Sequence, residues 1–336
     1  MKITALAVPI ALLISISAHA QKPSTAPSRQ PLVLTGAIPL PNVHGRIDHF
    51  SLDPQGRLFV SALGNNTEEV IDLAAGTVGH IISGIPRPQG VAYAADANEI
   101  FVGSDEGKLN IYNGASYDLI TSIDFGDDVD NLRYDPATKR LYLGYGDGAI
   151  AMLDAITNKR LEQEFKVGAH PESFQLEKAG PNIYVNVPDR KEVAVVNRNT
   201  GAITHWPLRL EGNFPMAVDE ADHRLFIATR QPPRFVVLDA NSGHVIATLP
   251  CGQDSDDMYY DPSRKRVYVV AGEGNISVFQ QSDPDHYSLL AKVPSAVGAR
   301  TAGYFGKGPK GFERFYVAVP ARADRGAEVL VYTVQD

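Results

Sequence analysis

The sequence predicts an all-β protein folded as a seven-bladed β-propeller of four-stranded blades. A short β-rich motif, which reads like Leu-Tyr-Val, recurs along the chain, and polar turn residues separate the copies. Successive copies start 41 to 48 residues apart, which suits four short strands and their turns. The seven copies begin at Arg57, Glu99, Arg140, Asn182, Arg224, Arg266 and Arg314.

Every repeat is expected to contain the same elements in the same order. A first strand leads through a hairpin turn into the recurring second strand, and a loop then leads to a third strand. That strand ends in Asp or Asn, and a polar turn precedes the fourth strand. Because Asp and Asn side chains cap turning backbone, we expect a structural role for these residues. They include Asp53, Asp135 and Asp261, each before a Pro, and the third-strand ends Asp72, Asp154, Asn197 and Asp239.

The two ends of the chain are expected to share one blade. Residues 328–334 match a third strand and have no fourth strand after them, whereas residues 32–40 resemble fourth strands such as 119–125. Pairing the N-terminal strand with the C-terminal blade would close the ring and remove an exposed sheet edge. The sequence therefore predicts one domain over residues 31–336.

Residues 1–20 read as a signal peptide. Lys2 is followed by the apolar run 3–16, and Ala18 and Ala20 give the small-x-small pattern of a cleavage site. A retained anchor is the alternative, but the run is short for a membrane span. Residues 21–30 are rich in Pro and Ser and are expected to form a flexible leader. The predicted location is the periplasm or the medium, with no span in the mature protein.

Composition and missing motifs exclude several classes of function. The net charge of −8 disfavours nucleic acid as a partner. Cys251 is the single cysteine, so no intrachain disulfide forms, and we expect it to be a small buried apolar side chain. The haem-attachment motif Cys-x-x-Cys-His is absent, and so is a glycine-rich phosphate cradle, so neither haem nor a nucleotide is expected. We expect a monomer.

The chain resembles the YVTN/YncE-like family of bacterial exported β-propellers. The resemblance covers residues 32–334 and rests on the Leu-Tyr-Val motifs, the third strands such as 193–197, and the Asn-Thr-Gly and Asn-Ser-Gly turns. It implies an extracytoplasmic propeller, and members of the family are largely described as binding or uncharacterised proteins. Trp206 is the single tryptophan, unlike WD-repeat propellers and the pyrroloquinoline quinone dehydrogenases with their repeated tryptophan motifs. No pyrroloquinoline quinone is therefore expected.

The residues at one equivalent position of the seven repeats predict a polar ring at one mouth of the central channel. We aligned the residue two places before the first apolar position of each innermost strand, where successive blades point to a common axis. Four of the seven residues are carboxylic acids, which is unlike a packing layer. The seven are Asp48, Gln89, Asp130, Glu172, Phe214, Asp256 and Arg300.

Titratable groups that converge in a concavity indicate a site, although a solvated rim is the plainer interpretation. Asp130, Glu172 and Asp256 are candidate ligands of Ca²⁺ or Mg²⁺, which prefer carboxylate oxygens. His49 and His170 are candidate proton carriers. The expected ligand-binding residues are Asp48, His49, Gln89, Asn131, Arg230 and Arg300.

Three functions fit this sequence. The first is a propeller that binds a small polar ligand, a metal ion or a protein partner at the polar mouth. The second is a metal-assisted lyase or lactone hydrolase, in which His49 or His170 moves a proton and Arg300 stabilises developing negative charge. The third is an interaction scaffold. No portable catalytic motif is present, which favours binding.

Overall fold

A computed structural model describes residues 30–306 and 313–336. The predicted signal peptide, and the predicted leader apart from Gln30, lie outside the described residues, so both stay predictions. Among the described residues, no helix combines the length and the apolar character needed to cross a membrane.

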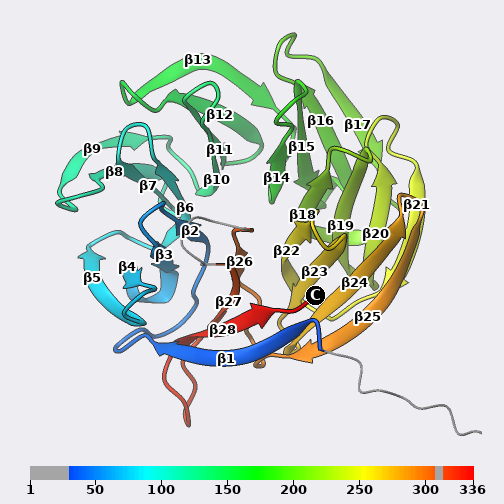
Figure 1. Cartoon of the computed structure of the whole chain (residues 1–336). Helices are drawn as coiled ribbons and strands as arrows, with labels where there is room; N and C mark the ends of the chain where they lie inside the picture. Colours follow the sequence, from blue (N-terminus) through cyan, green and yellow to red (C-terminus); the bar gives the residue numbers. More distant parts are fainter. Residues whose placement is uncertain (1–29, 307–312) are drawn as a thin grey trace, which may run out of the picture.

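Seven four-stranded antiparallel sheets surround one axis in this part of the chain, as predicted (Figure 1). Blade 1 contains β2 (Phe50–Leu52), β3 (Arg57–Ala62), β4 (Thr67–Asp72) and β5 (Thr77–Ser83). Blade 2 contains β6 (Pro88–Ala94), β7 (Glu99–Ser104), β8 (Lys108–Asn113) and β9 (Leu119–Asp124). Blade 3 contains β10 (Val129–Asp135), β11 (Arg140–Tyr145), β12 (Ala149–Asp154) and β13 (Lys159–Lys166). Short 3₁₀ helices span Leu63–Asn65 and Pro188–Arg190.

The other four blades continue the same order. They contain β14 (Phe174–Leu176), β15 (Asn182–Val187), β16 (Glu192–Asn197) and β17 (Ile203–Pro207); β18 (Glu211–Asp219), β19 (Arg224–Gln231), β20 (Pro233–Asp239) and β21 (Val245–Pro250); β22 (Ser255–Asp261), β23 (Arg266–Ala271), β24 (Asn275–Asp283) and β25 (His286–Pro294); and β26 (Ala302–Tyr304), β27 (Arg314–Val319), β28 (Glu328–Val334) and β1 (Leu32–Pro39).

The ring closes through β1 and β28, which lie side by side in blue and red (Figure 1). Their antiparallel register pairs Leu32 with Val334 and Pro39 with Glu328. The ladder extends past the strands, because the Gln335 amide donates to the Pro31 carbonyl at 2.9 Å. The predicted sharing of one blade between the two chain ends is confirmed.

The position of a strand in its blade explains how far its side chains are buried. Second strands such as β3 and β27 are buried at five of six positions, because neighbouring blades cover both of their faces. Fourth strands such as β9 have mostly exposed residues along the outer wall. Buried apolar side chains form seven clusters in the described part of the chain, and Cys251 is buried in one of them, as expected.

The predicted capping residues occupy the turns. Asp72 Oδ1 accepts hydrogen bonds from the amides of Ala74 and Ala75, at 2.9 and 3.0 Å. In the first hairpin of blade 1, Asp53 Oδ1 accepts from the Arg57 amide at 2.8 Å. These contacts satisfy turning backbone, so the structural interpretation of these carboxylates holds.

Candidate functional site

The predicted polar ring is assembled around the axis. The innermost strands β2, β6, β10, β14, β18, β22 and β26 surround the centre of the ring (Figure 1). Five of the seven aligned side chains line one small recess between them. These five are Asp48, Asp130, Glu172, Phe214 and Asp256.

The other two aligned residues lie beside this recess. Arg300 Nε pairs with Asp256 at 2.9 Å, and the Gln89 amide donates to Asp128. A Cβ atom on Gly90, the residue after Gln89, would overlap the Asp130 carbonyl oxygen, so blades 2 and 3 approach this closely only with glycine there.

Asp130 is the anionic centre of one half of the ring. Its carboxylate accepts a hydrogen bond from His49 Nε2 at 3.3 Å and from Asn131 Nδ2 at 3.0 Å, and it lies 3.9 Å from His170 Nε2. Burial alone would raise the pKa of Asp130, but the two histidines hold it well below its usual range. Asn131 is buried and serves to hold Asp130.

Both histidines next to Asp130 are predominantly protonated near neutral pH. Burial would lower the pKa of His49, but the hydrogen bond to Asp130 and the charge of Asp48 raise it to about 9. Burial would also lower the pKa of His170, and contact with Asp130 raises it to about 9. His170 Nδ1 donates to the Gly146 carbonyl at 2.9 Å. Neither histidine is a ready proton acceptor at neutral pH.

Burial leaves other carboxyl groups near the axis partly or wholly protonated. Burial and the negative charge of Asp130 raise the pKa of Glu172 to about 8. Burial raises the pKa of Asp257 to about 7, although the charge of His49 opposes this. The channel therefore carries less negative charge than its composition suggests.

Arginines neutralise the other half of the ring. Asp256 is held between Arg230 Nη2 at 2.5 Å and Arg300 Nε at 2.9 Å. Arg300 also reaches Asp254 at 2.9 Å, and the Arg230 guanidinium lies 3.7 Å from the centre of the Phe214 ring. Asp48 pairs with Arg46 at 2.9 Å.

These pairings weigh against the expected cation. Asp130 is bound by two histidines and Asp256 by two arginines, while Glu172 is largely protonated. Over residues 30–306 and 313–336, no group of three or more His, Cys, Asp or Glu side chains is arranged to hold a metal ion. The site for Ca²⁺ or Mg²⁺ stays a prediction.

The free space of the channel lies past the ring. The recess among the ring side chains measures only about 20 Å³, enough for about one water molecule. A cavity of about 1010 Å³ opens on its other side and takes residues from all seven blades. His49, Ser173 and Asp257 line both spaces, so they form the floor of the larger one.

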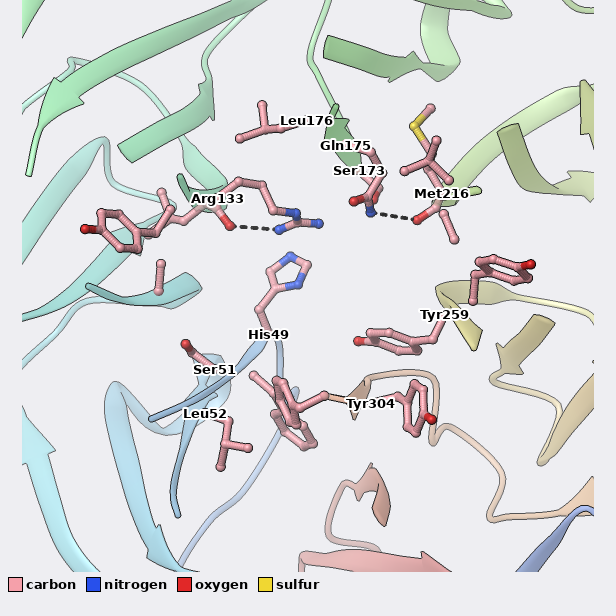
Figure 2. Close-up of a pocket in the computed structure, with 18 of the residues that line it drawn as sticks. His49, Ser51, Leu52, Arg133, Ser173, Gln175, Leu176, Met216, Tyr259 and Tyr304 are labelled. Carbon is pink, nitrogen blue, oxygen red and sulfur yellow. Dashed lines mark hydrogen bonds between the residues drawn. The ribbon is translucent and has the colours of Figure 1, made fainter. Parts of the chain in front are cut away.

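The cavity exists because a second register position carries mostly small side chains. This position lies three places after each ring position, and Figure 2 shows two of its longer side chains, Arg133 and Tyr259, extending toward the axis. Four of these seven residues are Ser, Ala or Gly, which cannot fill the channel. The seven are Ser51, Ala92, Arg133, Gln175, Ala217, Tyr259 and Gly303, and all but Gly303 line the cavity.

Aromatic rings and a few polar groups form the cavity wall. Gln175 Nε2 donates to the Met216 carbonyl at 2.9 Å (Figure 2). The Tyr259 hydroxyl donates to the Ala302 carbonyl at 2.6 Å. The opening is at the first hairpin turns, where Pro54, Pro136 and Pro262 are exposed. The aromatic lining residues are Phe50, Tyr93, Tyr134, Tyr259, Tyr260, Tyr304 and Phe305.

Arg133 on β10 is the functional candidate that the aligned ring did not include. Its Nη1 donates to the Leu132 carbonyl at 2.8 Å and its Nη2 to Asn131 Oδ1 at 3.3 Å. The guanidinium also lies 5.3 Å from the centre of the Phe174 ring. An arginine within an innermost strand, at a position where four other blades carry Ser, Ala or Gly, was the signal that could have found it.

The sequence relatives agree with this architecture. Over 252 residues the chain is 23% identical to the uncharacterized protein YncE of Salmonella typhi, and the match covers 73% of this chain and 67% of that protein. The YncE protein of Salmonella typhimurium matches with the same values. No family model matches the chain.

Solved structures match over most of the chain at low identity, so they show the fold alone. A chain of the mitotic checkpoint complex matches with a TM-score of 0.77 and 13% identity, over 98% of this chain and all of that one. The Kuenenia stuttgartiensis hydrazine synthase matches with a TM-score of 0.69 and 16% identity, over 88% of this chain and 98% of that one. The RRP9 WD40 repeats match with a TM-score of 0.74 and 11% identity, over 88% of this chain and 96% of that one.

Sequence similarity to YncE and seven four-stranded blades around one channel lead to the same conclusion. The chain is a seven-bladed β-propeller that is similar in sequence to YncE.

Proposed function

We propose that this propeller binds a small organic molecule in the wide cavity of its channel. The observation that carries the proposal is the cavity itself, about 1010 Å³ in volume and lined by all seven blades. Its size is at the upper end of the range of small-molecule sites, roughly 300–1,000 Å³. The proposed setting is the periplasm or the medium, as residues 1–20 predict.

The lining supports binding because it combines apolar walls with a few oriented polar groups. Tyr259, Tyr304 and Phe305 offer aromatic surface, and Arg133, His49 and Gln175 present polar atoms near the axis. Small-molecule sites usually have this composition. The ring acts as the closed end of the channel, since its charges are paired with one another.

A cavity-filling variant tests the proposal. The probe is N-phenylnaphthylamine, a neutral dye that fluoresces when it enters an apolar site. We expect saturable one-site binding to the native protein and at least roughly tenfold weaker binding to Ser173→Trp, because the indole occupies the cavity floor.

The control is Ser116→Trp, which adds the same indole at an exposed turn and should leave binding unchanged. Native protein that does not bind the dye, or equal binding by Ser173→Trp, would overturn the proposal.

A further inference from the structure

In the part of the chain that the structure describes, Arg133 differs from the other arginines of the channel because no carboxylate lies within ion-pair distance of it. Arg46, Arg230 and Arg300 each lie within 3 Å of a carboxylate oxygen. Within residues 30–306 and 313–336, the Arg133 guanidinium forms no ion pair with any Asp or Glu. Arg133 is half-buried, and a positive charge partly removed from water is costly unless an anion pairs with it.

The guanidinium keeps donors for such an anion. Of its five N–H groups, one donates to the Leu132 carbonyl and one to Asn131 Oδ1. Both acceptors belong to its own strand, so they orient the side chain toward the axis (Figure 2). The planar donor fork matches the two oxygens of a carboxylate or the oxygens of a sulfonate.

The groups around Arg133 favour an anion as well. Burial lowers the pKa of Arg133, and nearby Tyr259 and Asp257 oppose this, but an arginine remains charged at neutral pH. Asp257 carries only part of a negative charge, because burial raises its pKa to about 7. It accepts from the Ala302 amide at 2.7 Å. His49, on the cavity floor, is positive near neutrality.

The aromatic walls select the rest of the ligand. Tyr259 extends toward the axis in Figure 2, and six further aromatic residues line the cavity. Aromatic side chains stack on planar rings in offset or edge-to-face geometry, which adds affinity beyond burial of apolar area.

We propose that the cavity selects an aromatic organic anion, whose carboxylate or sulfonate pairs with Arg133 while its ring system packs against the tyrosine and phenylalanine wall. This inference rests on the proposed function, since it names the ligand class of the same cavity. The anion would provide the charge partner that Arg133 lacks in the described chain.

A displacement experiment on the native protein tests the charge preference without any variant. N-phenylnaphthylamine is bound first, and naphthoate or naphthamide is then added. These two competitors have the same ring system and differ in charge. We expect naphthoate to displace the dye at a concentration at least about tenfold lower than naphthamide, as charge-assisted hydrogen bonds predict. Equal displacement would overturn the inference.

Substitution of the arginine tests its role. We expect Arg133→Gln to abolish the preference for naphthoate over naphthamide, with both displacement concentrations corrected for the dye affinity measured on the same variant. Arg133→Lys should keep part of the preference, because it keeps the charge but loses the planar fork. Arg140→Gln, at an exposed arginine on the same blade, should behave like the native protein.

The outcomes separate the two proposals. Dye binding with no charge preference would leave the cavity as a binding site and overturn the aromatic anion. A charge preference that survives Arg133→Gln would overturn the role of Arg133. Failure of the dye to bind, or binding that Ser173→Trp does not weaken, would overturn the proposed function itself.

Discussion

A single carboxylate, Asp130, determines the protonation of the polar ring. It lies 3.3 Å from His49 Nε2 and 3.9 Å from His170 Nε2, and both histidines owe their raised pKa mainly to it. Its negative charge also contributes to the raised pKa of Glu172. Two half-buried imidazolium groups are tolerated here because Asp130 pairs with both.

Replacing Asp130 by Asn should lower the pKa of His49 and His170 from about 9 toward or below the ordinary 6.5. NMR titration of the imidazole protons measures this directly. Leaving buried charges without their partner should cost about 3–5 kcal/mol of unfolding free energy. Asp118→Asn is the control, because Asp118 is exposed and its carboxylate forms no hydrogen bond or ion pair in the described chain; it should change stability by less than about 0.5 kcal/mol.

The same substitution should change how stability depends on pH. A folded pKa above the unfolded value contributes stability that is fully present below pH 6.5 and is lost as the pH rises through about 9. Glu172 and Asp257 act in the same direction, since their folded pKa values are also raised. We expect the native protein to lose stability between pH 7 and pH 9.5, and Asp130→Asn to lose clearly less. Parallel urea-unfolding profiles for the two proteins would contradict this assignment.

At the scale of a single element, β1 shows how one strand contributes to two blades' packing. Leu32 and Ile38 are buried, and Ile38 packs in the cluster between blades 7 and 1. Leu34 on the same strand is 54% exposed. The backbone pairing with β28 includes both Leu34 and Ile38, so burial is the main difference between these two positions.

Ile38→Ala should therefore lower the unfolding free energy by about 2–4 kcal/mol, since it removes buried methylene and methyl groups and leaves a cavity. Leu34→Ala removes a similar volume from the outer wall and should cost less than about 0.5 kcal/mol. Equilibrium urea unfolding of both variants measures the difference. Equal losses would mean that β1 stabilises the ring through its backbone alone.

At the scale of the whole molecule, the ring is closed by an antiparallel pair of strands, β1 and β28, from opposite ends of the described chain. The Pro31 carbonyl and the Gln335 amide are hydrogen-bonded, so the described termini are adjacent. A chain without β1 would leave blade 7 with three strands and expose the edge of β28, which invites aggregation.

A circular permutant should fold, because it keeps every strand pair. Its design joins Asp336 to Gln30 through a short glycine-rich linker and opens the chain at the exposed turn near Thr200, between β16 and β17. We expect a melting temperature within about 10 °C of the native value, whereas a chain that starts at Leu40 should aggregate or melt far lower. The pair is compared by circular dichroism and size-exclusion chromatography. A soluble, cooperatively folded truncation would contradict the closure role of β1.

Period and turn chemistry were enough to predict the blades from the sequence. Second strands starting at Arg57 or Arg266 are apolar because two neighbouring blades bury them, so the pattern is local and repeats. The repeated order of strands and turns also predicted the capping role of Asp72 and the pairing of residues 32–40 with the last blade. The ring positions followed from the period, which is why Asp130 and Asp256 were found together.

What the sequence by itself determined is the repeat, and with it the fold and the residues that face the axis. Only the tertiary structure decided which of those residues neutralise one another and where space remains. Charge pairing between Asp130 and His49, 81 positions apart, depends on distances across the channel that no local pattern encodes. The cavity likewise arises because Ser51, Ala92 and Ala217, on three different blades, have small side chains. These small side chains leave an open space only because the fold brings the blades together around one axis.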